Sequence, residues 1–180
     1  MSEPSTPPIS EAYRREQQSL HENPAYGVSS IEHAPLVKQL IEQVGVRSLT
    51  DYGAGKQHLK HALSQLGLEI EYHPYDPAFP EYGEAQPAEL VCCIDVLEHI
   101  EPEFLDRVLD ELKALTRRYG FLTVHTGPAK KVLSDGRNAH LVQQPSSWWM
   151  PRICDRFEIE TMRRTRGGFF VVVSPRAEGA

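Results

Sequence analysis

The sequence predicts an α/β fold: a mostly parallel sheet between two layers of helices. Two observations predict it. From about residue 33 onward, short apolar segments typical of strands alternate with amphipathic segments typical of helices. Near the end of the chain, two strand-like segments follow each other with only a four-residue turn, "TRGG", between them. Such a short turn requires antiparallel pairing, so the sheet is predicted to close with a hairpin.

The size and charge of the chain suit one soluble domain. Its 180 residues are enough for one core and too few for two typical domains. A net charge of -6 argues against a surface that binds nucleic acid all over, although a local basic face stays open. Cys92, Cys93 and Cys154 form neither a disulfide framework nor a zinc spacing. With no apolar run near the ~18 residues of a membrane span and no apolar signal at the start, we expect a cytoplasmic protein without a membrane segment.

Three regions are predicted along the chain. Residues 1–10 contain three prolines and three serines, which predicts a disordered leader. Residues 11–35 are predicted to form an N-terminal arm, with a short helix and then a loop at "NPAYG". This arm either packs against the domain or closes over a ligand as a lid. The main domain is predicted to span residues 36–180.

The elements follow in order. The segment "HAPLVKQLIEQVG" predicts a helix that ends at Gly45, and "VRSLTDYGAGK" predicts a strand followed by a glycine turn. The segment "KQHLKHALSQLG" predicts the next helix, and "LEIEYHPYD" predicts a strand that ends at Asp76. Next come the strand "AELVCCID", a helix over 101–120 and the buried strand "FLTVHTG". The closing hairpin consists of "FEIETMRR" and "FFVVVSP".

The turn "DYGAGK" is the first candidate ligand site. Gly53 and Gly55 allow a tight turn and a close approach of the backbone to a ligand at the mouth of the sheet. Asp76 ends the next strand, where a carboxylate can accept hydrogen bonds from both hydroxyls of a ribose. The simpler alternatives are a plain strand-to-helix turn and an ordinary turn aspartate.

The chain resembles the class I S-adenosylmethionine (SAM)-dependent methyltransferases over roughly residues 36–175. The resemblance rests on "LTDYGAGK", "YDP", "DVLEHI" and the closing hairpin. It implies a three-layer Rossmann-like sheet, SAM as cofactor and S-adenosylhomocysteine (SAH) as product. The cofactor-binding residues that it implies, with Tyr26 contributed by the arm, are Asp51, Gly53, Ala54, Gly55, Asp76, Pro77, Asp95, Val96, Leu97 and Tyr26.

Two departures from the family pattern matter. Gln57 replaces the usual third glycine, which disfavours a dinucleotide pyrophosphate but matters less for a cofactor without phosphates. Only eleven residues separate Asp76 from the next strand, whereas a further helix and strand need about a dozen or more. We therefore expect the family's third strand to be missing, and with it the adenine-binding acid. Phe79 and Tyr82 are expected to cover the adenine instead.

The stretch "DVLEHI" places three potential metal ligands at the end of a strand. The simpler interpretation is that Asp95 and Glu98 only order the start of a helix. Together with a histidine of the following long loop, the stretch resembles the metal site of the plant small-RNA 2′-O-methyltransferases. This resemblance implies that Mg²⁺ or Mn²⁺ is held by Asp95, Glu98, His99 and His140. Asp95 is shorter than the family's glutamate, so its contact to the metal is expected to run through water.

Without a metal, a histidine can act as general base, and the candidates are His140 first, then His99 and His125. The predicted reaction is O-methylation of a small hydroxylated molecule such as a sugar, phenol or nucleoside. An RNA or DNA end is the alternative acceptor, and a catalytically silent SAM-binding subunit is the alternative outside enzymes. Lys130, Lys131 and Arg137 are candidate contacts for a phosphate or carboxylate. Nothing in the sequence fixes the oligomeric state.

Overall fold

A computed structural model describes residues 8–177 of the chain, and its centre is a six-stranded sheet. The strand order is β2-β1-β3-β4-β6-β5. The strands are β1 (Ser48–Tyr52), β2 (Glu71–Tyr75), β3 (Ala88–Ile94), β4 (Thr116–His125), β5 (Phe157–Arg164) and β6 (Gly168–Pro175). The strands β1 to β4 pair in parallel, whereas β6 pairs antiparallel with both β4 and β5. The predicted α/β class and the closing hairpin are confirmed.

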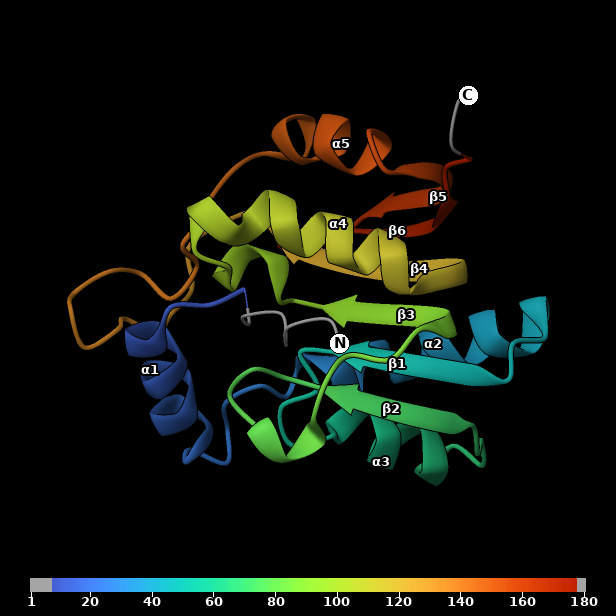
Figure 1. Cartoon of the computed structure of the whole chain (residues 1–180), viewed down its shortest axis with the longest axis horizontal. Coiled ribbons are helices and arrows are strands. Elements are labelled where there is room, and N and C mark those ends of the chain that lie inside the picture. The colour runs from blue at the N-terminus through green and yellow to red at the C-terminus, as the bar shows by residue number, and fades with distance from the viewer. Residues whose placement is uncertain (1–7, 178–180) are drawn as a thin grey trace, which may run out of the picture.

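Helices cover both faces of this sheet (Figure 1). One face carries α2 (Ser29–Val44) and α3 (His58–Gln65), and the other carries α4 (Leu105–Leu115) and α5 (Ser146–Cys154). Alternate residues of β3 divide between the two layers: Cys92 belongs to the cluster with α2 and α3, and Cys93 to the cluster with α4 and α5. This alternation explains why "ELVCCI" is apolar throughout. None of the helices in residues 8–177 is long and apolar enough to cross a membrane.

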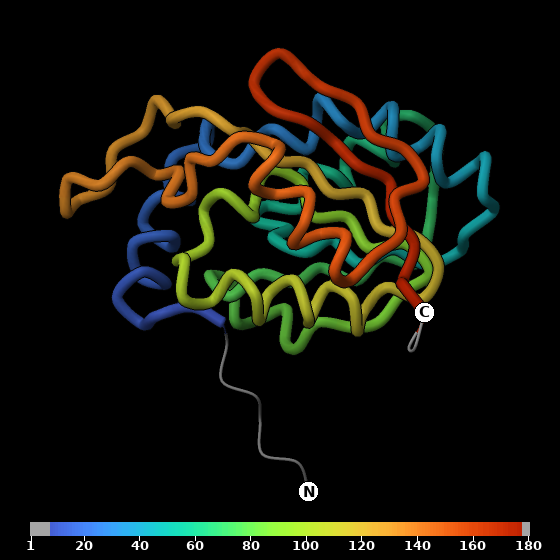
Figure 2. The backbone as a smooth tube through the Cα atoms, turned by 90° about the horizontal axis from the view of Figure 1, so that it is seen from above, coloured from blue at the N-terminus to red at the C-terminus, as the bar shows by residue number. Residues whose placement is uncertain are grey.

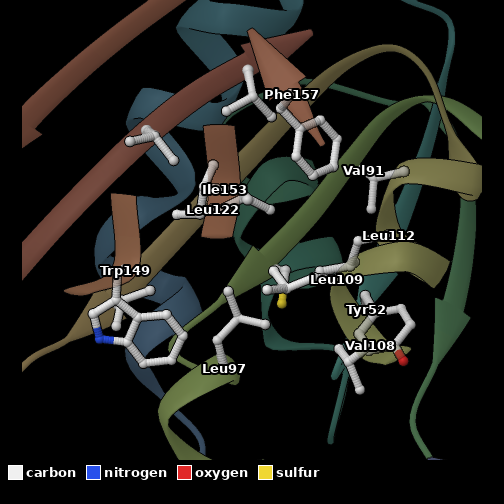
Figure 3. Packing of buried hydrophobic residues seen from close by; sticks show 14 of the residues in the cluster. Tyr52, Val91, Leu97, Val108, Leu109, Leu112, Leu122, Trp149, Ile153 and Phe157 are labelled. Carbon is white, nitrogen blue, oxygen red and sulfur yellow. The ribbon is translucent and has the colours of Figure 1, made fainter. Parts of the chain in front are cut away.

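The larger core lies between the sheet and the α4–α5 layer (Figure 3). Its fully buried members include Leu109 and Leu112 from α4, Trp149 from α5 and Phe157 from β5. Each such side chain contributes roughly 1.5–3 kcal/mol of burial free energy. This packed core holds the carboxyl ends of the parallel strands in place.

The connection from β2 to β3 is short, as predicted. It contains only the 3₁₀ turn η1 (Pro80–Tyr82), and β2 pairs only with β1. The described part of the chain therefore has no strand beyond β2, and the expected loss of the third strand is confirmed. As a result, the segment after Asp76 is free to lie at the edge of the sheet.

The helix predicted over 101–120 is too long. The structure has a 3₁₀ turn η3 (Pro102–Phe104) and then α4, which ends at Leu115, and β4 begins at Thr116. Thr116 pairs with Ala88, so β3 recruits the segment "TRRYG", which has no strong periodicity of its own, into the sheet. Gly120 is not a helix stop: an added Cβ there would lie 2.7 Å from Val173 Cγ2 of β6.

The N-terminal arm begins with α1 (Glu11–His21), which lies beyond the carboxyl ends of the parallel strands (Figure 1). Of the predicted leader, residues 1–7 lie outside the described residues, and Pro8 is buried. Ser10 is the N-cap of α1, and its hydroxyl accepts a hydrogen bond from the Tyr13 amide. The Ser10 backbone N–H and hydroxyl each donate to the Glu101 carboxylate at 2.7 Å. The start of α1 is thus tied to the loop after β3.

Candidate functional site

A cavity of about 520 Å³ opens at the carboxyl ends of the parallel strands. In open α/β sheets this is the edge at which ligands bind. The turns after β1, β2 and β3, the loop after β4 and the helix α1 all contribute to its wall. The sequence-predicted residues that line it are Tyr26, Asp51, Gly53, Ala54, Gly55, Asp76, Pro77, Asp95, Val96, His99, His125 and His140. The fold therefore brings nearly the whole predicted set to one place.

The glycine turn after β1 has the conformation that its sequence requires. Gly53 has φ +86°, and a Cβ there would lie only 2.4 Å from Val96 Cγ2. Its amide and that of Ala54 both donate to the Tyr75 carbonyl, at 2.8 and 3.0 Å. The turn is thereby fastened to the end of β2, and its backbone passes close to the start of the loop after β3.

Asp76 connects the turn after β1 with the turn after β2. Its Oδ2 accepts a hydrogen bond from the Gly55 amide at 2.9 Å, and its Oδ1 accepts one from the Ala78 amide at 2.8 Å. Burial raises the pKa of Asp76, and these two hydrogen bonds oppose the shift. Each carboxylate oxygen retains a lone pair for a ligand hydroxyl.

Asp51 lies beneath the same turn, buried at the end of β1. Burial raises the pKa of Asp51 to about 7, and the Tyr72 hydroxyl, which donates to it, opposes the shift. Asp76 adds repulsion in the same upward direction. Two buried, poorly hydrated carboxyls close to each other favour a ligand that carries positive charge.

Three residues expected near the cofactor are not among those that line the cavity. Leu97 is buried in the core, with 0% solvent exposure, and does not face the cavity. It packs near Trp149 (Figure 3). Phe79 and Tyr82 are not among the residues that line the cavity; their rings stack at a centroid distance of 5.3 Å. The Tyr82 hydroxyl donates to the Gly55 carbonyl at 2.8 Å, so it supports the glycine turn from behind.

A group of metal-ligand type lies at the ends of β3 and β4. One ligand atom each from Glu98, His99 and His140 come within 4.8 Å of one another. Glu98 is fully buried: its Oε1 accepts from the His125 amide at 2.8 Å, and its Oε2 has no hydrogen-bond partner among the described residues. A buried carboxylate oxygen without a hydrogen-bond partner is costly, and a cation bound at Glu98 Oε2 would satisfy it.

The two imidazoles of the group are oriented by backbone carbonyls. His99 Nδ1 lies 2.8 Å from the Ala139 oxygen, and His140 Nδ1 lies 2.6 Å from the Gly127 oxygen. A carbonyl oxygen only accepts, so each Nδ1 carries the proton and each Nε2 keeps its lone pair for a ligand. Metal-binding histidines are oriented in the same way. The donor set of one carboxylate and two imidazoles fits a first-row divalent cation such as Mn²⁺.

Charges within the group are strongly perturbed. Burial, with repulsion from Asp95, raises the pKa of Glu98 well above its usual range. Burial lowers the pKa of His99 to about 4, and the neighbouring His140 adds to this shift. Burial also lowers the pKa of His140. Both histidines are therefore neutral near pH 7, as a general base or a metal ligand must be.

Asp95 and His125 border this group but do not belong to it. Asp95 has φ +51°, and its carboxylate accepts a hydrogen bond from the Thr123 hydroxyl at 2.6 Å, which turns it toward β4. The His125 ring centroid lies 4.9 Å from that of His140. The structure thus assembles three of the four expected metal ligands, with Asp95 beside them.

The sequence reasoning missed the contribution of α1 to the cavity wall. Tyr13, Gln17 and His21 all line the cavity from this helix. The Tyr13 hydroxyl donates to the His99 carbonyl at 2.8 Å, and His21 lies against Gly55, where an added Cβ would come within 2.8 Å of His21 Cε1. The signal was present: these residues are spaced by four, which places them on one helical face.

Comparison with known proteins supports the architecture. No protein-family model matches the chain. No curated protein matches it in sequence either. Among solved structures, 1,6-didemethyltoxoflavin-N1-methyltransferase from Burkholderia thailandensis, with bound 1,6-didemethyltoxoflavin and SAH, is similar with a TM-score of 0.63. That match has 13% identity and covers 98% of this chain and 94% of the other.

Two further structures show the same likeness. Magnesium protoporphyrin IX methyltransferase (ChlM) from Synechocystis PCC 6803, with bound SAM, has a TM-score of 0.56 and 15% identity, and the match covers 93% of this chain and 92% of the other. An O-methyltransferase family protein from Burkholderia thailandensis has a TM-score of 0.58 and 12% identity, with 96% of this chain and 64% of the other covered. At these identities the likeness shows the fold alone, a Rossmann-like α/β fold that this chain shares with these methyltransferase structures.

Proposed function

We propose that this chain is a SAM-dependent methyltransferase that methylates a hydroxyl group of a small molecule. The observation that carries the proposal is one cavity with two chemically distinct halves. One half has the glycine turn and Asp76, and the other has the oriented imidazoles of His99 and His140. The similar structures with bound SAM or SAH support the cofactor assignment at the level of the fold.

In the cofactor half, each residue has a role that suits SAM. Asp76 accepts hydrogen bonds from the ribose hydroxyls, and the turn at Gly53 lets the methionine part approach the backbone. The carboxyls of Asp51 and Asp95 provide negative charge near a cofactor that carries an ammonium group and a sulfonium. These roles require no phosphate-binding glycine at Gln57.

In the acceptor half, an imidazole takes the proton. The acceptor oxygen attacks the methyl carbon, the carbon–sulfur bond breaks, and the sulfonium leaves as the neutral thioether of SAH. The proton of the acceptor hydroxyl passes to Nε2 of His140, which is neutral before the reaction. Most of the rate enhancement comes from alignment of oxygen, methyl and sulfur in a site from which water is excluded.

Glu98, His99 and His140 also fit a divalent cation, as the unpartnered Glu98 Oε2 indicates. A cation bound there would lower the pKa of the acceptor hydroxyl and so supply the activation that a general base otherwise provides. The cation class that we propose is Mn²⁺ or Mg²⁺. The three residues would then serve as ligands, with the His125 amide supporting Glu98 through its hydrogen bond to Oε1.

The cofactor half is tested by calorimetric titration with SAH of the wild type and of Asp76→Asn. The variant loses the charge that strengthens two ribose hydrogen bonds, so we expect SAH affinity to fall about 10- to 100-fold. Glu81→Gln, an exposed site in η1, is the control and should retain wild-type affinity. Wild-type affinity in Asp76→Asn would remove the ribose role, and no binding of SAH to the wild type would overturn the proposed function.

The metal assignment is tested by titration with Mn²⁺. Glu98→Gln replaces an anionic ligand with a neutral amide of the same shape, so we expect Mn²⁺ binding to be lost while SAH affinity stays within about twofold. The control is Glu103→Gln, which removes an exposed carboxylate from η3. Equal Mn²⁺ affinity in Glu98→Gln and Glu103→Gln would show that the group binds no metal.

A further inference from the structure

Charges are separated along the cavity. Asp51 near the end of β1 and Asp76 directly after β2 line the cavity, as do Asp95 and Glu101 in the segment after β3, whereas Lys130 and Lys131 lie in the loop after β4. Because the sheet order is β2-β1-β3-β4, Asp51 and Asp76 on the β2–β1 side and the lysines on the β4 side approach the cavity from opposite ends. In residues 8–177, these two lysines are the only lysine or arginine side chains that line the cavity.

The backbone that carries the lysines is fixed. The Lys131 carbonyl accepts a hydrogen bond from the Ala139 amide at 3.0 Å. Asn138 closes the same loop with two hydrogen bonds to the backbone of Ala129, each of 2.9 Å. Ala139 in turn orients His99 through its carbonyl. The lysines therefore belong to a hydrogen-bonded loop that also positions the imidazoles of His99 and His140 (Figure 2, orange tube).

The charge of the lysines is not neutralised by the loop itself. No carboxylate of the described residues lies within ion-pair distance of Lys130. Hydrogen bonds from Ser134, at 2.5 and 2.8 Å, are the main cause of the lowered pKa of Glu16, and the charge of Lys131 adds to it. Arg137 differs, because its guanidinium pairs with Asp135 at 2.7 Å and does not line the cavity.

We propose that the methyl acceptor is a small hydroxylated anion, such as a sugar phosphate or a hydroxylated carboxylate, whose anionic group is bound by Lys130 and Lys131. This inference rests on the proposed function, since it names the acceptor class of the same site. The hydroxyl to be methylated lies at His99 and His140, between the lysines and the cofactor half. An anion entering the other way would meet the carboxyls of Asp51 and Asp76, so the charge separation also sets the orientation of the acceptor.

Two cations fit a single phosphate or carboxylate better than a polymer. Binding of an RNA strand relies on several lysine or arginine contacts along the backbone. This chain has a net charge of -6, and the described cavity wall offers only Lys130 and Lys131. A small acceptor is therefore the class that the observed charges favour.

The test is calorimetric titration of the protein, saturated with SAH and Mn²⁺, with matched neutral and anionic ligands. The pairs are ribose with ribose 5-phosphate, and catechol with 3,4-dihydroxybenzoate. We expect the anionic member of at least one pair to bind about tenfold tighter or more, because charge-assisted hydrogen bonds are the stronger ones. The double variant Lys130→Ala/Lys131→Ala should lose this preference and keep wild-type SAH affinity.

The control is Lys113→Ala/Arg117→Ala, which removes the same charge from α4 and the start of β4. It should keep the preference for the anion. The proposal is overturned if no anionic ligand binds better than its neutral partner, if none binds at all, or if the preference survives in Lys130→Ala/Lys131→Ala. It is also overturned if a ten-nucleotide single-stranded RNA binds tighter than every small anion with a steep dependence on salt.

SAH titration of the same sample distinguishes a failure of the acceptor class from a failure of the proposed function. If SAH binds and the anion preference is absent, only the acceptor class is wrong. If SAH does not bind, the proposed function fails, and the acceptor class fails with it.

Discussion

His140 shows how much of the site one residue can reveal in advance. Its position in a long polar loop after a buried strand indicates a role near the ligand. What the sequence does not reveal is the partner of its Nδ1, because the Gly127 carbonyl comes close only when the loop after β4 folds back. That contact, more than the residue type, fixes the proton on Nδ1 and frees Nε2.

His140→Gln tests this residue directly. Glutamine keeps a polar side chain of similar reach but has no basic nitrogen, so we expect turnover to fall about 100-fold or more while SAH affinity changes less than about threefold. Methyl transfer from labelled SAM to an accepted substrate is the measurement. His61→Gln, an exposed position on α3, is the matched control. Wild-type turnover in His140→Gln would exclude His140 as both base and ligand.

Asp95 and Leu97 show the limit of motif reasoning at this scale. Both belong to "DVLEHI", and the motif alone assigns them to the cofactor, with Asp95 also among the metal ligands. The left-handed backbone at Asp95 and its hydrogen bond to Thr123 depend on the neighbouring strand β4. The buried side chain of Leu97 depends on α5. Neither partner is close in sequence, so neither orientation could be predicted from the motif.

At the scale of elements, α1 has a larger role than the sequence predicted. A short helix in residues 11–35 was expected, but its contacts with three separate loops were not. Tyr13 binds the loop after β3, Gln18 donates to the Ala78 carbonyl after β2 at 3.1 Å, and Glu16 accepts from Ser134 in the loop after β4. The helix therefore joins the loops that form the cavity wall.

Tyr13→Phe tests the attachment of α1. The variant keeps the ring in the small cluster with Leu20 and Leu133 but removes the hydrogen bond to the His99 carbonyl. We expect a local loss of about 1 kcal/mol, seen as faster tryptic cleavage at Arg14 and Arg15 and weaker SAH binding. Tyr119→Phe, in β4, is the control. Cleavage of both variants at the wild-type rate would show that this bond does not hold the helix.

The boundary between α4 and β4 shows why element limits are less predictable than elements. The apolar spacing of Leu105, Leu109 and Leu112 identifies the helix correctly. The next residues have no strong periodicity, and their state is decided by the pairing of Thr116 with Ala88. Because that pairing joins segments 28 residues apart in the sequence, local patterns could not locate the change from helix to strand.

At the scale of the whole molecule, the fold follows from the sequence in most respects. Alternating strands and helices, the final hairpin and the eleven-residue connection predicted the sheet and its missing strand. Glycine turns and acids at strand ends predicted the edge at which the cavity lies. The cavity wall formed by α1 and the positions of Phe79 and Tyr82 depend on packing between distant segments, so the sequence patterns did not reveal them.

The central claim is that one cavity holds the cofactor beside the imidazole group. A crystal structure of the protein with SAH and Mn²⁺ tests it most directly. The account predicts the SAH ribose hydroxyls on the Asp76 carboxylate, the sulfur facing His99 and His140, and Mn²⁺ density between Glu98 and the two imidazoles. SAH bound at another place, or bound here with its sulfur turned away from the histidines, would contradict it.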